Sequence, residues 1–277
     1  TYGRMHQDLV LISNLYTVDR KQDRLRQEHE HLVAAVQRTQ KELADATTRA
    51  QAAVKALATA IPTKVIAGHH AYLVVAMIHG RNPRNDKLFL YLGGLIGGGW
   101  GAKQGEDGVN VTVCMNDGDT HNGPSEQVEN KFPLLVKHYR LRQDSGGAGE
   151  FRGGLGAECE VVSLARVNYQ TRVDRVQNAP WGLAGGKSAL GNLIGMRKKD
   201  GSETLFNTGK VNMRLEAGEA YTLRSGGGGG FGNPEKRARA AVLRDLRLGY
   251  ISEAAARRDY GVVPTAKERA VIEGGAA

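Results

Sequence analysis

The sequence predicts an α+β protein, in which a mainly β, glycine-rich body of mixed or antiparallel strands is flanked by helices on both sides. Three observations support this fold class. Short apolar runs separated by turn signals fill the middle of the 277-residue chain. No helical pattern between these runs is long enough for regular βαβ crossovers. Helical periodicity precedes and follows them. We therefore divide the chain into a helical extension (1–62), the glycine-rich body (63–232), C-terminal helices of the same domain (233–263) and a tail (264–277).

The N-terminal extension has the pattern of a long helix or a helix pair. The segment Asp19–Leu57 contains no Gly or Pro, and its apolar residues recur at steps of three, four or seven. The stripe is thin and the other faces are charged, so we expect packing against a neighbouring helix or subunit, with a free-standing coiled coil as the alternative. Ile61-Pro62 is predicted to end the helix. The stripe consists of Leu25, Leu32, Val36, Leu43, Ala50, Val54 and Leu57.

Six apolar runs in the body are predicted to be strands, and turn signals separate them. The predicted turns are Asn116–Gly118, Asp200-Gly201 and Glu216–Gly218. After the body, Asn233 and Pro234 are typical of the start of a helix, and Gly249 is typical of its end. Ser252 is predicted to cap a second short helix that stops near Tyr260-Gly261. The predicted strands are Tyr72–Ile78, Val109–Cys114, Leu134–Val136, Cys159–Val162, Leu193–Met196 and Tyr221–Leu223.

The run Arg142–Gly156 holds six glycines among fifteen residues, with charged residues placed singly between them. A flexible linker would be a monotonous Gly/Ser stretch. We therefore predict a folded loop in which Asp144 and Arg152 fix the backbone through hydrogen bonds or an ion pair. Glycine suits positions of close backbone approach or positive φ. The positions predicted to exclude a Cβ are Gly146, Gly147, Gly153 and Gly154.

Two further charged residues and two further glycine runs are candidates for positioning a substrate or a loop. Asp174 and Arg175 are charges near apolar, glycine-rich surroundings, where buried Asp–Arg pairs hold loops at least as often as they perform chemistry. The run Gly226–Gly230 precedes a predicted helix and could cradle an anion with backbone N–H groups. It lacks the Lys-Ser/Thr of a P-loop and any Gly-x-Gly-x-x-Gly unit, so a tightly packed turn is the favoured alternative. The candidate glycines are Gly97, Gly98, Gly99, Gly226, Gly227 and Gly228.

The stretch Asp117–Asn122 carries the residue types of a catalytic loop. His121 and Glu126 could orient a substrate or assist proton transfer, with Asp117 beside them. A calcium loop is excluded, because His121 occupies its fifth position and Val128 stands where a bidentate Glu belongs. A turn stabilised by Asx side chains, including Asn122, is the alternative.

Other chemistries find less support in the sequence. Neighbouring residues of a strand point to opposite faces, so His69 and His70, even with His79 nearby, do not predict a metal site. Motifs for a serine nucleophile or a zinc protease are absent. Thr1 lacks a preceding Met, and truncation explains this more simply than an N-terminal nucleophile.

The composition excludes several functional classes. The net charge of +9 is spread over all three parts of the chain, and aromatic residues make up only 6%. A nucleic-acid partner is therefore not expected, because such proteins concentrate their basic residues. Cys114 and Cys159 form neither a disulfide framework nor a zinc spacing, which favours the cytoplasm. No apolar run reaches the roughly 20 residues that span a membrane.

The glycine-rich run at 142–156 resembles the C-terminal half of the hydantoinase B/5-oxoprolinase B-type family. Further segments match this family in order over roughly residues 65–263. They are Gly97–Ala102, Asn116–Glu126, Pro180–Gly186, Ser225–Pro234, Gly249–Ala255 and Asp259–Val263.

This resemblance implies a B-type subunit of an ATP-dependent enzyme that opens cyclic amides such as hydantoins, 5-oxoproline or lactams. It implies a hetero-oligomer with an A-type subunit, which binds ATP and Mg and phosphorylates the small-molecule substrate. A ketone carboxylase subunit of the same family and a non-catalytic scaffold subunit are the alternatives. The family's metal-binding His and Asp residues lie in its N-terminal half, which this chain is expected to lack. We therefore expect the isolated chain to be inactive and to bind no cofactor.

Overall fold

The structure is a computed structural model of the chain and describes residues 48–70, 74–113 and 123–274, together with Gln27, Glu42 and Asp45. The candidate residues Asp117, His121 and Asn122 lie outside the described residues. The chain divides into two compact units, Thr1–Ala53 and Val54–Ala277.

The described end of the N-terminal extension is helical. Residues 48–60 form a helix that ends at Ile61, and the 3₁₀ helix η1 (Pro62–Lys64) follows, as predicted. Most of the remaining predicted helix lies outside the described residues. Within the second unit, Val54 and Ala58 pack against a small apolar cluster. This cluster consists of Val65, Ala67, Ala102, Leu183 and Phe231.

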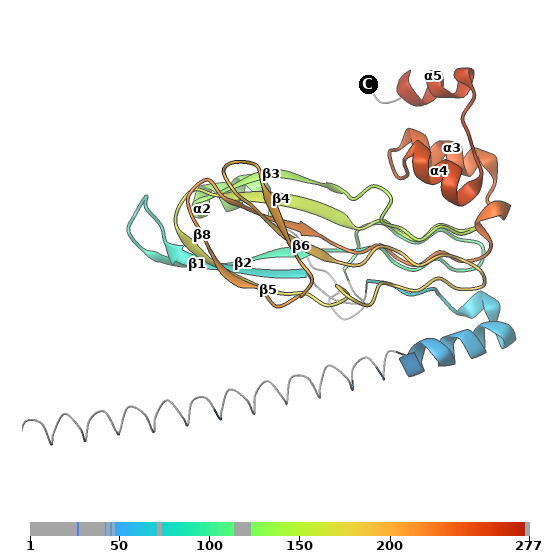
Figure 1. Cartoon of the computed structure of the whole chain (residues 1–277), viewed down its shortest axis with the longest axis horizontal. Coiled ribbons are helices and arrows are strands. Elements are labelled where there is room, and N and C mark those ends of the chain that lie inside the picture. Colours follow the sequence, from blue (N-terminus) through green and yellow to red (C-terminus); the bar gives the residue numbers. More distant parts are fainter. Residues whose placement is uncertain are drawn as a thin grey trace, which may run out of the picture. The chain divides into compact units, whose positions relative to one another are not determined.

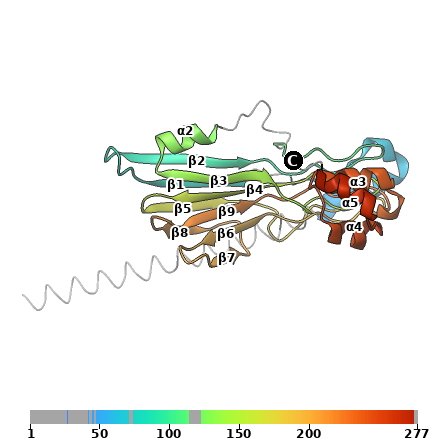
Figure 2. The same cartoon turned by 90° about the horizontal axis from the view of Figure 1, so that it is seen from above.

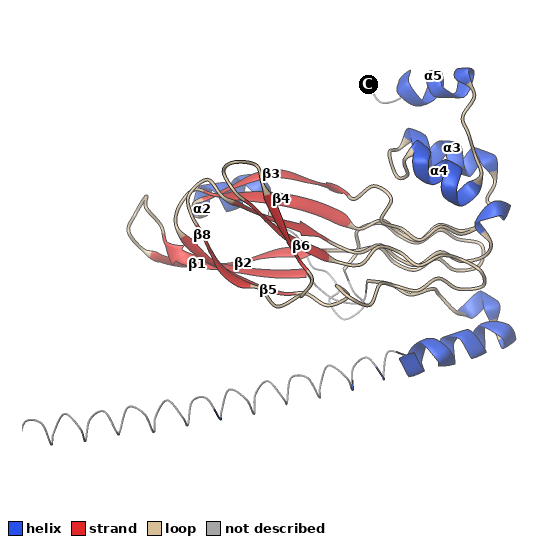
Figure 3. Ribbon diagram, viewed as in Figure 1, coloured by secondary structure: helices blue, strands red, loops and turns tan. Residues whose placement is uncertain are grey.

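The body contains two antiparallel sheets that pack face to face (Figures 1 and 3). Every strand pair within them is antiparallel, which confirms the predicted fold class and the absence of βαβ units in the described part. The four-stranded sheet has the order β2 (Leu88–Ile96), β1 (Val74–Arg81), β5 (Val167–Arg172), β8 (Asn212–Leu215). The five-stranded sheet has the order β3 (Leu134–Leu141), β4 (Ala157–Ser163), β9 (Ala220–Arg224), β6 (Leu193–Arg197), β7 (Glu203–Phe206).

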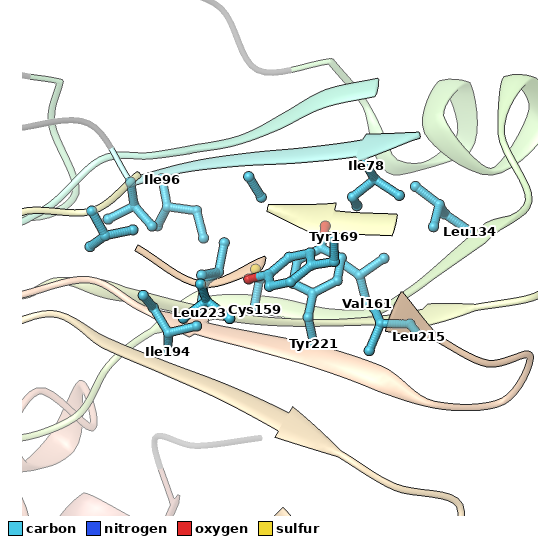
Figure 4. Close-up of a cluster of buried hydrophobic side chains, with 14 of the residues drawn as sticks. Ile78, Ile96, Leu134, Cys159, Val161, Tyr169, Ile194, Leu215, Tyr221 and Leu223 are labelled. Atoms are coloured by element: carbon cyan, nitrogen blue, oxygen red, sulfur yellow. The ribbon is translucent and has the colours of Figure 1, made fainter. Parts of the chain in front are cut away.

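The core lies between the two sheets (Figure 4). Alternate residues of β1 are buried, as expected for a strand with one face toward a core. Tyr169 of β5 stacks on Tyr221 of β9, with ring centroids 4.8 Å apart, so an aromatic pair joins the sheets at their centre. The helix α2 (Ser125–Lys131) lies beside β2 and β3 (Figure 2). Phe132, just after α2, packs against Tyr91 of β2, with ring centroids 4.9 Å apart.

Five of the six predicted strands overlap β1, β3, β4, β6 and β9. The prediction of a strand at Val109–Cys114 is wrong for residues 109–113, which form a single bridge, Gly98↔Thr112. The physical reason is that successive backbone groups bond to different segments. Val111 donates its N–H to the Leu155 carbonyl, whereas Thr112 donates to Gly98. Val111 also has a φ of 45°, which interrupts an extended conformation.

The C-terminal helices are η2 (Pro234–Lys236), α3 (Arg239–Arg247), α4 (Glu253–Tyr260) and α5 (Ala266–Gly274). Ser252 caps α4 as predicted, and Gly261 ends it in the left-handed conformation. The prediction of a tail at 264–277 is wrong for 266–274. These residues form α5, which begins with a capping box. The side chains of Thr265 and Glu268 each accept a hydrogen bond from the other residue's backbone N–H.

Candidate functional site

Glycine-rich segments beyond the ends of the strands pack into what we call the glycine bundle, formed by residues 97–102, 146–154, 182–190 and 226–231. The central segment, 226–231, bonds in turn to each of three surrounding segments. Residues three apart in this segment therefore bond to the same surrounding segment. A repeat of three residues per turn is that of a polyproline II helix. The partners are Gly154 and Gly147 for Gly228, Gly68 and Ala102 for Gly229, Lys187 and Leu183 for Gly230, and Phe151 for Phe231.

The bundle requires glycine because its backbones approach one another closely. A Cβ at Gly153 would lie far inside 3.0 Å of the Gly228 carbonyl, a distance that real Cβ atoms essentially never show. A Cβ at Gly154 would meet the carbonyl of Val109 in the same way. The prediction that these glycines exclude a side chain is confirmed, and it holds equally for Gly146 and Gly147.

The run Gly226–Gly230 does not form an anion cradle. Each of its five N–H groups already donates to an acceptor of the protein itself. Since an anion site needs N–H groups directed at the ligand, the packed alternative describes this run. The acceptors, in order, are Asn192 Oδ1 and the carbonyls of Leu190, Gly154, Gly68 and Lys187. Gly98 and Gly99 likewise donate their N–H groups, to the carbonyls of Thr112 and Gly226, and the Gly97 carbonyl accepts from the Ser225 hydroxyl.

Asp144 and Arg152, which are predicted to position the glycine-rich loop, each bond to the C-terminal helical region. The Asp144 carboxylate accepts a hydrogen bond from the Ser252 N–H at 2.8 Å, just before α4. Arg152 is 3% exposed, pairs with Asp245 of α3 at 3.3 Å and lies over the ring of Tyr250. These contacts join the glycine bundle to the C-terminal helices.

A buried ion network extends this junction. Arg237 donates to Asp107 at 2.7 and 2.8 Å and to the fully buried Asp245 at 2.7 Å. Burial alone would raise the pKa of Asp107, but hydrogen bonds from Arg237 and Arg152 outweigh it and hold this pKa below its ordinary value. The sequence analysis missed this network. Its only sequence signal is Asp245 itself, a carboxylate placed beside the apolar face of a helix.

Two histidines, two tryptophans and Arg175 gather around residues 68–70; we call this group the imidazole–arginine cluster. The rings of His69 and Trp100 lie 6.1 Å apart, and those of His69 and His70 lie 6.4 Å apart. The Arg175 guanidinium lies 5.3 Å from the ring centroid of Trp181. Backbone bonds from Gly68 to Trp181 and from His70 to Gly99 hold the segment against the glycine bundle.

The cluster combines neutral imidazoles with a cation. Burial lowers the pKa of His70 to about 4, and the neighbouring His69 and Arg175 add to this shift. Burial lowers the pKa of His69 as well, with Arg175 again contributing. Both rings are therefore neutral at pH 7. His70 Nε2 lies 3.0 Å from the Gly98 nitrogen and 2.9 Å from the Thr112 oxygen, so its tautomer decides whether it accepts or donates.

Other predicted site residues are not members of this cluster, although Asp174 is the chain neighbour of Arg175. Asp174 is exposed, and its backbone carbonyl accepts from Asn192. Glu126 is exposed in the first turn of α2, and His79 lies on β1. Within the described ranges, no three His, Cys, Asp or Glu side chains are placed to hold a metal ion.

An apolar cavity of about 540 Å³ lies where α2 meets the two sheets. Its walls include Tyr91, Phe132, Tyr139 and Tyr221, and a pocket of this size fits a small molecule. Cys159 also lines it, but burial raises the pKa of this thiol to about 12. Cys159 is therefore a core residue and not a nucleophile.

The protein is an α+β protein with two packed antiparallel sheets. Beyond the strands, its glycine-rich loops are held together by backbone hydrogen bonds. The chain belongs to the hydantoinase B/oxoprolinase family, which it matches over residues 33–234. The resemblance drawn from the sequence is thereby confirmed. None of the helices described is long and apolar enough to cross a membrane.

Named relatives are considerably longer than this chain. It is 32% identical over 216 residues to a protein of Pseudomonas sp. (strain NS671) described as the B-type subunit of a D-/L-hydantoinase. It is 35% identical over 227 residues to the beta subunit of the caprolactamase of Pseudomonas jessenii. Each match covers 78% of this chain but only 36% and 38% of the respective relative, so the chain spans less than two fifths of their length.

Solved structures show the same fold. The crystal structure of the ATP-dependent caprolactamase from Pseudomonas jessenii is 28% identical, with a TM-score of 0.67 over 80% of this chain and 40% of that chain. A nucleotide-free acetone carboxylase is 20% identical, with a TM-score of 0.63 over 79% of this chain and 34% of that chain. At 20% identity the latter likeness concerns the fold alone.

Proposed function

We propose that this chain is the C-terminal portion of a B-type subunit in an ATP-dependent, cytoplasmic enzyme that hydrolyses a cyclic amide. The observation that carries the proposal is the family match over residues 33–234, together with relatives named as subunits of a hydantoinase and a caprolactamase. The substrate class comprises hydantoins, 5-oxoproline and lactams, all of which contain an amide C–N bond within a ring.

The proposed partner is an A-type subunit that binds ATP and Mg and activates the substrate. The hydrogen bonding of this chain supports such a division of labour, because the N–H groups of Gly226–Gly230 are all engaged within the protein. Any divalent metal of the enzyme would belong to the portion of the B-type subunit that this chain does not span.

The imidazole–arginine cluster is the site that we assign to substrate binding. The Arg175 guanidinium suits a carboxylate or phosphate, such as an activated amide would carry. The flat faces of Trp100 and Trp181 suit a planar ring. Neutral His69 can accept a proton at pH 7, because burial and Arg175 lower its pKa. The catalytic roles predicted for Asp117, His121 and Glu126 belong to the same proposal.

The ketone carboxylase alternative is supported by the fold alone, through the acetone carboxylase structure. The scaffold alternative is supported by the saturated backbone hydrogen bonds of the glycine bundle. The carboxylase, the scaffold subunit and the cyclic amide hydrolase predict different reaction products, so one set of assays distinguishes the three functions.

The test uses the complex purified through an affinity tag on this chain. Ring opening of hydantoin, 5-oxoproline and caprolactam is measured with and without ATP, beside fixation of labelled bicarbonate into acetone. We expect ATP-dependent ring opening of one cyclic amide, and at least a tenfold loss of kcat/KM in Arg175→Gln. The matched control is Arg166→Gln, an exposed arginine paired with Glu216, which should retain activity. Bicarbonate fixation without ring opening, or full activity of a complex lacking this chain, would contradict the proposal.

A further inference from the structure

The outer faces of the two sheets differ in chemistry. The outer face of the five-stranded sheet carries ion pairs across its strands, as expected for a face in contact with water. Three of these pairs are Arg140–Glu158, Arg197–Glu160 at 3.0 Å and Arg224–Glu203 at 3.0 Å. This face provides an internal reference for the other sheet.

The outer face of the four-stranded sheet is apolar along β2. Leu88, Leu90 and Leu92 of β2 are 78%, 60% and 63% exposed. Between them, Phe89 and Tyr91 turn inward, where both rings contact Phe132. The leucines therefore line one side of the strand and the aromatic residues line the other.

Strand register extends this apolar surface onto β1. Met77 pairs with Leu92, and His79 pairs with Leu90, so Met77 lies beside the leucines on the same face. The surface gives way to polar residues at His79 and Arg81 of β1, which pair with Leu90 and Leu88, and it stays polar on the far side of β1. Gln170, Asn168 and Arg214 occupy the corresponding positions of β5 and β8. We call Leu88, Leu90, Leu92 and Met77 the leucine face.

A strand that is apolar on both faces is typical of a sheet covered on both faces. The position of β2 strengthens this argument, because β2 is the edge of its sheet and an exposed apolar edge strand favours association. The leucine face thus has the chemistry of a covered surface.

We propose that the leucine face is the surface on which the rest of the B-type subunit packs, an inference that rests on the proposed function. The occupant is inferred from the relatives, because the matches to this chain cover only 36% and 38% of their length. Arg172 and Arg214 are exposed along the polar side of the same face, so carboxylates on the occupant would complement their charge. The occupant has an apolar centre and carboxylates at its rim.

The test places a photo-crosslinking amino acid at Leu90 in the tagged complex used for the ring-opening assays. The matched control position is Leu205, which is 52% exposed on β7 of the ion-paired sheet. We expect crosslinked peptides from B-type sequence outside residues 1–277 at Leu90, and at least tenfold fewer at Leu205. Crosslinks to the ATP-binding subunit, to a second copy or to residues 1–53 would overturn the assigned occupant. Equal crosslinking at both positions would also overturn it.

A variant provides an independent measurement. Leu88→Ser, Leu90→Ser and Leu92→Ser together should lower the fraction of chain recovered in the complex at least tenfold, measured by native mass spectrometry. The melting temperature of the isolated chain should change little, because these side chains are exposed. Leu205→Ser should leave the assembly intact. Ring opening without the expected crosslinks refutes the leucine face alone, whereas the expected crosslinks without ring opening refute the proposed function alone.

Discussion

At the scale of single residues, the glycines of the bundle allow neighbouring backbones to pack closely together and do not serve as flexible points. Gly228 is surrounded by backbone, and a Cβ there would meet the Trp100 carbonyl and the Gly101 nitrogen. Glycine loses more conformational freedom on folding than any other residue. In the bundle this cost is offset because each glycine of the central run gains hydrogen bonds to neighbouring segments.

We expect Gly228→Ala to destabilise the chain by at least about 3 kcal/mol, the upper end of the usual cost of overpacking, because only backbone atoms lie near the added methyl group. Thermal unfolding followed by circular dichroism measures this loss. Gly274→Ala is the matched control, since no atom lies within 4 Å of its added Cβ. An unchanged melting temperature in Gly228→Ala would show that the bundle is loosely packed.

His70 should make stability depend on pH. Burial lowers its pKa from 6.5 to about 4, so between these values the unfolded chain binds a proton that the folded chain does not. Stability should therefore fall as the pH drops from 6.5 to 4, by up to about 3 kcal/mol from this group. Urea unfolding at several pH values should show a shallower slope for His70→Gln. Leu205→Ser on β7 changes an exposed side chain and no titratable group, so it should keep the parental slope.

At the scale of elements, the predicted strands overlap β1, β3, β4, β6 and β9, whereas β2, β5, β7 and β8 are not among them. The strand β2 (LFLYLGGLI) consists largely of β formers, so its residue types alone indicate a strand. Three of the other wrong or missed elements have identifiable causes. Residues 109–113 are apolar enough for a strand, but the glycine bundle takes their hydrogen bonds. The strand β5 (VNYQTR) is polar at alternate positions and short, and its place depends on pairing with β1. The helix α5 depends on a capping box in a segment with few apolar residues.

The junction between α3 and the glycine bundle depends on Asp245. It is fully buried and accepts hydrogen bonds from both Arg152 and Arg237. Asp245→Asn would leave two buried guanidinium groups without their shared carboxylate, which typically costs about 3–5 kcal/mol. Hydrogen exchange of α3 amides, combined with the melting temperature, measures the effect. Glu216→Gln removes the exposed partner of Arg166 and should alter neither measurement detectably.

At the scale of the whole molecule, the family could be recognised from glycine-rich motifs, but the candidate site could not be assembled from them. Arg175 was a candidate from sequence, whereas Trp181 and Trp100 entered only as parts of motifs. His69 and His70 were set aside because a regular strand would separate them. In the structure they precede β1 in irregular backbone, and their rings lie 6.4 Å apart. Long-range contacts such as Gly68 to Trp181 leave no periodic signal in a sequence.

The division of labour proposed for the enzyme predicts that this chain alone neither binds nor hydrolyses ATP. An ATP site needs N–H groups or cations around the phosphates and acidic side chains for Mg²⁺. The five N–H groups of Gly226–Gly230 are engaged within the bundle, and the part of the chain that the structure describes offers no metal cluster. Equilibrium dialysis with Mg-ATP should therefore show no saturable binding below about 1 mM, and phosphate release should stay at the blank rate. Adding the ATP-binding subunit should restore turnover. ATP hydrolysis that follows the isolated chain through successive purification steps, and that Arg175→Gln abolishes while Arg166→Gln does not, would place the nucleotide on this chain instead.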